Sequence, residues 1–190
     1  MKFVQNRPRS VRLPYGEALW IVAQACALPG PALSALDARI RQLQKQGITA
    51  RRENEKFVRL EYGLVEIAGL ATGIKLLSAF MAPTVAARYV SECWPQVAPA
   101  LVAGIGDAAP NAWHETRPAI GGRYLVFAGA ALNEIGRKAA SEGRYDWPLG
   151  SVRSFADADV AAVASAAGGA GVILDTAVYM PSVVRQISCM

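Results

Sequence analysis

The segment from residue 31 to residue 60, PALSALDARIRQLQKQGITARRENEKFVRL, constrains the fold more than any other part of the chain. Residues 32–46 carry apolar side chains at helical spacing, and Gly47 stands where a left-handed residue commonly ends such a helix. The basic sequence that follows predicts two short strands between residues 48 and 61, around a polar turn at residues 53–55. The segment therefore predicts an amphipathic helix followed directly by a β-hairpin.

The predicted helix at residues 32–46 has two unlike faces. Four apolar residues form the stripe that we expect to face the core: Leu33, Leu36, Ile40 and Leu43. The opposite stripe and its flanks carry small or polar side chains: Ser34, Ala38, Arg41 and Lys45, with Ala35, Arg39, Gln42 and Gln46 beside them. Small side chains allow close approach to a groove floor, and Arg and Gln pair bidentately with guanine and adenine. Such a helix suits the major groove of duplex DNA.

Positive charge is concentrated in the first third of the chain. The net charge of the whole chain is +5, but residues 1–60 hold 11 Lys and Arg against 4 Asp and Glu, whereas residues 61–190 hold 9 against 11. This asymmetry favours a polyanionic partner for the first third. Arg7, Arg9 and Arg12 lie in an extended arm that is suited to the minor groove. The alternatives are a solvated basic surface and a frayed terminus without a binding role.

The remaining sequence predicts further helices and two stretches with strand character. Apolar residues recur at helical spacing in residues 16–27 and 64–80. Further helices are predicted at residues 84–94, 96–105 and 130–141. Ser154 is a candidate N-cap for another helix at residues 155–167. Residues 123–128 predict either a strand or the opening of a helix, and residues 172–179 are rich in strand-forming side chains.

The order of elements in the first third resembles the winged helix-turn-helix family of bacterial transcription regulators. A helix, a tight turn, a helix containing RIRQLQKQGI and then TARRENEKFVRLEYG are similar to the recognition helix and wing of MarR-like and related regulators. The resemblance covers about residues 15–63. It implies that helix 32–46 enters the major groove and that a wing at residues 48–61 contacts the backbone or minor groove. Because Glu53 and Glu55 stand at the wing tip, we expect the wing to contact DNA along its strands.

The expected fold class is mostly α with a small β-hairpin wing. We expect an N-terminal winged helix-turn-helix within residues 1–94, followed by an α-rich or α+β part for dimerisation or effector sensing in residues 95–190. The expected DNA-binding residues come from the arm, the helix and the wing strands: Arg7, Arg9 and Arg12; Ser34, Ala35, Ala38, Arg39, Arg41, Gln42 and Lys45; Arg51, Arg52, Lys56 and Arg59.

The sequence contains no recognisable motif for catalysis, metal binding or cofactor binding. His114 is the single histidine, and Cys26, Cys93 and Cys189 are too far apart for a zinc-type or disulfide pattern. The glycines fit neither a phosphate-binding loop nor a dinucleotide fingerprint. We therefore expect no catalytic residue, no metal and no cofactor. Cys26 and Cys93 lie in apolar stretches typical of core cysteines, and a reactive thiol is the alternative.

The sequence also predicts a cytoplasmic protein with no membrane partner. The basic N-terminus is not followed by the apolar run of a signal peptide. The most apolar stretch, residues 64–82, is interrupted by Glu66 and Lys75, which favours a buried helix over a membrane span.

Three functional hypotheses follow from these patterns. The first is a sequence-specific transcriptional regulator that binds double-stranded DNA as a homodimer, with a small-molecule effector as an option for its second part. The second is a replication or partition accessory protein of a plasmid or phage that uses the same module. The third is an enzyme or small-molecule-binding protein whose basic hairpin is incidental. The aromatic residues of the second part suit a ligand pocket, a dimer interface or a core.

Overall fold

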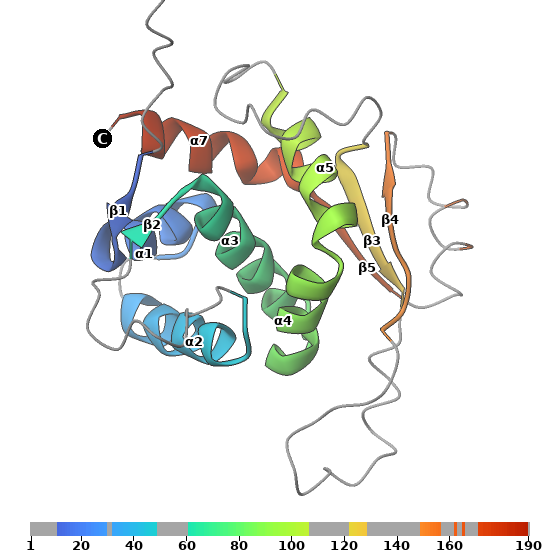
Figure 1. Cartoon of the computed structure of the whole chain (residues 1–190), viewed down its shortest axis with the longest axis horizontal. Coiled ribbons are helices and arrows are strands. Elements are labelled where there is room, and N and C mark those ends of the chain that lie inside the picture. The colour runs from blue at the N-terminus through green and yellow to red at the C-terminus, as the bar shows by residue number, and fades with distance from the viewer. Residues whose placement is uncertain are drawn as a thin grey trace, which may run out of the picture.

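The computed structural model describes residues 11–29, 32–48, 61–106, 122–128, 149–156, 162, 165 and 171–189. The elements whose bounds it describes are six α-helices, a 3-10 helix and five strands in two antiparallel sheets (Figure 1). In chain order they are β1 (Leu13–Pro14), α1 (Tyr15–Ala25), α2 (Leu33–Lys45), β2 (Glu61–Tyr62), α3 (Leu64–Ser78), α4 (Pro83–Glu92), α5 (Trp94–Ile105), β3 (Tyr124–Ala128), β4 (Val152–Phe155), β5 (Gly171–Asp175), η4 (Thr176–Val178) and α7 (Met180–Ser188). The prediction of a mostly helical fold is confirmed. Most of the predicted wing, residues 49–60, lies outside the described residues.

Helix α3 is the central helix of the core. All of residues 67–74 are buried, as expected for a helix that is apolar on every side. Helices α1, α2, α4 and α7 pack against it (Figure 1). The buried Thr72 hydroxyl lies 2.8 Å from the carbonyl oxygen of Ala68 and 3.0 Å from the hydroxyl of Tyr179, the residue before α7, so its polar group is satisfied. The prediction of a buried helix over this stretch is confirmed.

The end of α2 has the backbone pattern that its sequence predicts. Gly47 adopts φ +99°, the left-handed conformation that favours glycine. The Gly47 amide donates to the Gln44 carbonyl at 3.0 Å, and the Ile48 amide donates to the Leu43 carbonyl at 3.2 Å. These two bonds form a Schellman motif, in which Ile48 also folds back toward the apolar face of the helix. The predicted C-terminal glycine is therefore confirmed.

A three-stranded sheet lies at the opposite side of the molecule from α2 (Figure 1). Its order is β4-β3-β5, with β3 antiparallel to both neighbours, and Val126 of β3 faces Arg153 and Ile173 in the ladder. Side chains alternate across the central strand. Leu125 and Phe127 join the main core, whereas Val126 is buried on the other face with Phe155. Of the two alternatives for residues 123–128, the strand is confirmed.

Tyr89 connects α4 to this sheet. Its hydroxyl donates to the carbonyl of Ala128 at 2.7 Å and accepts from the amide of Gly150 at 3.0 Å. Its ring meets Phe127 edge-on, with the centroids 5.3 Å apart. One side chain thus satisfies two backbone groups at the edge of the helical layer.

Two local predictions in the second half are corrected by the structure. Ser154 does not cap a helix, because it lies within β4 and pairs with Leu125; of the helix predicted at residues 155–167, Ala162 and Ser165 are helical. The strand character of residues 172–179 ends at Asp175, whose side chain accepts a 3.0 Å hydrogen bond from the Ala177 amide and so starts η4. Helix α7 was not predicted from the sequence; it tolerates Pro181 because this residue lies in its first turn. The predicted helix at residues 130–141 lies outside the described residues.

The buried side chains of both halves form one continuous core. It extends from Leu13 in β1 to Val184 in α7 and includes residues of all six described α-helices. Helix α7 packs on α1, so the two ends of the described chain lie side by side (Figure 1). The division of the chain near residue 95 stays a prediction. Within the described residues, no helix has both the length and the apolar character needed to cross a membrane.

Candidate nucleic-acid interface

Helix α2 lies at the edge of the molecule and packs on α1, α3 and α4 with one face (Figure 1). Leu36, Ile40 and Leu43 are buried, with at most 2% of each residue exposed, as the sequence predicts. Leu33 was expected to face the core as well, but 39% of it is exposed. It is the first residue of the helix, so it stands at the end of the apolar stripe rather than within it.

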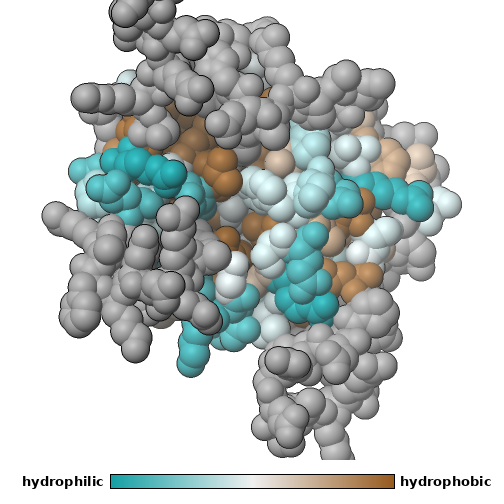
Figure 2. All heavy atoms as spheres, in the orientation of Figure 1, coloured by the Kyte–Doolittle hydropathy of each residue, from teal (hydrophilic) through white to brown (hydrophobic). Residues whose placement is uncertain are grey.

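The outward face of α2 carries the residues that the sequence predicts for DNA contact. Every one of them in this helix is exposed: Ser34, Ala35, Ala38, Arg39, Arg41, Gln42 and Lys45. The small side chains lie in the N-terminal half and the long polar ones in the C-terminal half. Hydrophilic atoms cover the region of the C-terminal end of α2 in Figure 2. The exposed face thus carries small side chains at its N-terminal end and long polar ones at its C-terminal end.

An ion pair restrains the central arginine of this face. Arg41 Nε lies 3.0 Å from Asp37 Oδ2 and 3.1 Å from Oδ1, one helical turn earlier. The hydroxyl of Tyr15, at the start of α1, donates to Asp37 Oδ1 at 2.5 Å. The Arg41 guanidinium also stands over the Tyr15 ring, 5.9 Å from its centroid. Tyr15, Asp37 and Arg41 therefore form one contact group, which we call the arginine clamp.

Titration in the arginine clamp follows these contacts. The Tyr15 hydrogen bond, with Arg41 nearby, lowers the pKa of the Asp37 carboxyl. Burial, together with the bond to Asp37, raises the pKa of Tyr15 to about 12. The hydrogen bond and charge of Asp37 raise the pKa of Arg41. Asp37 is therefore a carboxylate and Tyr15 a neutral hydroxyl at neutral pH.

Neither Asp37 nor Tyr15 was predicted from the sequence as a site residue. The spacing of four residues between Asp37 and Arg41 is a readable signal for an ion pair on a helix. No local signal links Tyr15 to α2, because Tyr15 and Asp37 lie on different helices and are 22 residues apart in sequence.

A two-residue ladder between β1 and β2 stands beside α2. Leu13 pairs with Tyr62, and Pro14 pairs with Glu61. The buried Tyr62 accepts a 2.6 Å hydrogen bond from Gln44 Nε2 of α2, and its ring lies 5.9 Å from that of Tyr15. The ladder therefore holds residues 13–14 and 61–62, which follow the arm and segment 49–60 in the sequence, next to each other beside α2.

Arg12 is the one predicted arm residue within the described part of the chain. Its side chain is 47% exposed, and its NH1 lies 3.2 Å from Glu66 Oε1 of α3. The other carboxylate oxygen of Glu66 accepts from the Gly63 amide at 3.0 Å, which caps the start of α3. The remaining predicted DNA contacts lie outside the described residues: Arg7, Arg9, Arg51, Arg52, Lys56 and Arg59.

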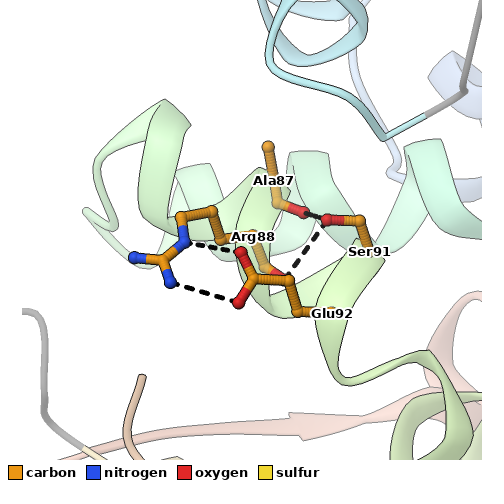
Figure 3. A network of polar contacts seen from close by, with 4 residues as sticks. All are labelled: Ala87, Arg88, Ser91 and Glu92. Atoms are coloured by element: carbon orange, nitrogen blue, oxygen red, sulfur yellow. Dashed lines mark hydrogen bonds and ion pairs between the residues drawn. The ribbon is translucent and has the colours of Figure 1, made fainter. Parts of the chain in front are cut away.

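A second polar network lies along α4. Arg88 and Glu92 form a two-point ion pair along α4, with Nε to Oε1 at 2.7 Å, and Ser91 donates to the Ala87 carbonyl at 2.9 Å (Figure 3). The structure brings no three His, Cys, Asp or Glu side chains of its described part together as metal ligands. His114 lies outside this part.

The cysteines differ in their surroundings. Cys26 is buried and Cys93 half-buried, and burial raises the pKa of the Cys26 thiol to about 11. Burial also raises the pKa of Cys93. The alternative of a reactive thiol at either position is not favoured, because a raised pKa leaves little thiolate at neutral pH. Cys189 is exposed at the end of α7.

No protein-family model, no curated protein and no solved structure matches this chain. The function is therefore argued from the chemistry and geometry of the site.

Proposed function

We propose that this protein is a sequence-specific, double-stranded DNA-binding transcriptional regulator that places α2 in the major groove. The observation that carries the proposal is the composition of the exposed face of α2. That face combines small side chains in one half with arginines, a glutamine and a lysine in the other, on a helix anchored by a buried apolar stripe. A major groove about 12 Å wide admits such a helix and presents acceptors that suit Arg and Gln.

The β1–β2 ladder supports the proposal by its position. Both basic segments of the first third, the arm and residues 49–60, join the described fold at this ladder. Phosphate contacts fix the register of a protein on a duplex, whereas base contacts discriminate between sequences. Under the proposal, the lysines and arginines next to the ladder contact phosphates on either side of the groove that α2 occupies.

The proposed assembly is a homodimer on a palindromic site. Two copies of α2 related by a two-fold axis would occupy half-sites about one helical turn apart. Residues 95–190 would supply dimerisation or bind a small-molecule effector. A replication or partition role would use the same contacts, and the genomic position of the bound sites, at promoters or at an origin, separates the two roles.

The test is selection of bound duplexes from a random pool at about physiological salt. We expect one palindromic sequence to be enriched, with an affinity that falls as salt rises. Arg41→Ala should lower the discrimination at one base pair of each half-site by about 1–3 kcal/mol. Arg185→Ala, which removes an exposed arginine from α7, is the control and should leave the base preference unchanged. If no duplex binds, or binding does not depend on salt, the proposal is wrong.

A further inference from the structure

The arginine clamp places a carboxylate on the surface that we propose faces DNA. A negative charge there opposes the approach of phosphates, so it weakens the binding of every duplex alike. Asp37 is nevertheless the residue that holds Arg41, through two contacts to Nε at 3.0 and 3.1 Å. Attraction between positive side chains and phosphates does not explain why a carboxylate holds an arginine on this surface.

Restraint of Arg41 provides that explanation. An unrestrained arginine has about 2 kcal/mol of rotamer entropy, much of which is lost when its guanidinium is fixed on a base. The pair with Asp37 uses Nε, and a guanidinium held in this way still carries terminal N–H groups for the O6 and N7 atoms of guanine. Part of the ordering is then complete before DNA arrives.

Tyr15 makes the restraint rigid. Its backbone begins α1 directly after β1, and its hydroxyl donates to the same Asp37 oxygen that Arg41 contacts. Its ring stands beneath the guanidinium and beside the Tyr62 ring. The orientation of Arg41 is thus fixed relative to the β1–β2 ladder, and the basic segments adjoin this ladder in the sequence.

We propose that Asp37 and Tyr15 are positioning residues that hold Arg41 for recognition of a guanine, at the expense of general affinity for DNA. The inference rests on the proposed function. It differs from a direct role of Asp37 on DNA, in which the carboxylate itself would accept a hydrogen bond from a cytosine amino group.

The two roles of Asp37 predict losses of discrimination at different base pairs for one substitution. Asp37→Asn removes the charge while keeping the size of the side chain. In this variant, discrimination should fall about tenfold at the same base pair at which Arg41→Ala lowers it. Affinity for a random duplex should rise about two- to fivefold. Tyr15→Phe should lower the discrimination by a smaller factor, because the ring under Arg41 remains, and should leave the affinity for a random duplex unchanged, because the Asp37 carboxylate remains. A role in folding alone would not raise affinity for random DNA.

The matched control is Glu92→Gln on α4. It removes one carboxylate from an Arg–Glu pair of the same helical spacing, and so makes the same change in net charge (Figure 3). Base discrimination should stay within about twofold of the wild-type value. Asp37→Glu keeps the charge and should retain most of the discrimination. Melting curves of all variants should confirm that each is folded at the assay temperature.

The decisive measurement is the DNA affinity of Asp37→Asn, Arg41→Ala and the double variant. Each affinity is measured on the selected site, on that site with the Arg41-dependent base pair replaced, and on a random duplex. If Asp37→Asn adds nothing to the loss caused by Arg41→Ala, the two residues act as a unit, as we propose. Unchanged discrimination in Asp37→Asn, or a loss at a base pair that does not depend on Arg41, would overturn the inference while the proposed function stands. If the wild-type protein enriches no sequence, the proposed function itself fails.

Discussion

Gly73 of α3 lies against the end of α2, and an alanine at this position tests how closely α2 is seated on the core. A Cβ atom on Gly73 would lie 2.6 Å from Ile48 Cδ1 and 3.0 Å from Leu43 Cδ1. These are the two residues of the Schellman motif whose side chains fold over the end of the helix. Both atoms are the ends of flexible side chains, so the methyl group can be accommodated only if these side chains or the end of α2 shift.

The magnitude follows from two opposing effects. Replacing glycine by alanine within a helix stabilises the fold by about 1 kcal/mol. Overpacking a close-packed site costs about 1–3 kcal/mol. For Gly73→Ala we therefore expect a free energy of unfolding that is unchanged or lower by up to about 2 kcal/mol. Gly69→Ala, one turn earlier in the same helix, gains the first effect without the second, because its nearest neighbour would be Val90 Cγ1 at 3.6 Å.

The assay is urea unfolding of the two variants and the wild type under identical conditions. The quantity that isolates the contact is the difference between Gly69→Ala and Gly73→Ala, expected at about 1–3 kcal/mol. For a chain of this size, that difference corresponds to roughly 2–12 °C in melting temperature. Equal stability of the two variants would show that the end of α2 does not pack on α3 as described. Gly73→Ala should also weaken DNA binding under the proposed function, although the residue is buried.

Three further outcomes are expected from the core. Gly104→Ala would drive its methyl group into Thr176, whose backbone carbon would lie 2.7 Å away, and should lower the free energy of unfolding in urea by about 2–4 kcal/mol. The control Gly16→Ala, whose Cβ would have no neighbour within 4 Å, should be neutral or slightly stabilising. Equal free energies of unfolding for the two variants would contradict the close packing at Gly104. Tyr89→Phe leaves a carbonyl and an amide without their partner and should lower the free energy of unfolding by about 1–3 kcal/mol; an unchanged melting temperature would contradict this role. Burial raises the pKa of Cys26 from 9.0 to about 11, so the folded state keeps a proton that the unfolded state loses, and stability should fall by about 1.4 kcal/mol per pH unit between these values. In Cys26→Ala, urea midpoints over the same pH range should lack this part of the slope.

The sequence predicts well those features whose cause is local. Helix α2, its glycine C-cap and the buried helix α3 each follow from side chains within one element, by spacing or by backbone preference. The outward residues of α2 were predicted for the same reason. Their exposure is set by the phase of the apolar stripe.

The errors occur where distant segments decide the outcome. Ser154 satisfies the local requirements of a helix cap, but pairing with Leu125 places it in a strand. The arginine clamp depends on Tyr15, which reaches Asp37 from another helix. The sequence separation of Tyr15 and Asp37 does not indicate that the two side chains lie close together. The clamp could have been anticipated only in part, from the spacing of Asp37 and Arg41.

The position of α2 depends on both halves of the chain. It packs on α1, α3 and α4; α1 packs on α7, and the hydroxyl of Tyr179, next to α7, reaches Thr72 within α3. Close-packed interiors transmit displacements, so a shift of α7 or of the sheet held by Tyr89 can reach α2 through helices that it touches directly. The proposed effector or dimer contact in residues 95–190 would therefore need no separate linker to alter DNA binding. It would need one of these helices to have two arrangements and a ligand that binds one of them more tightly.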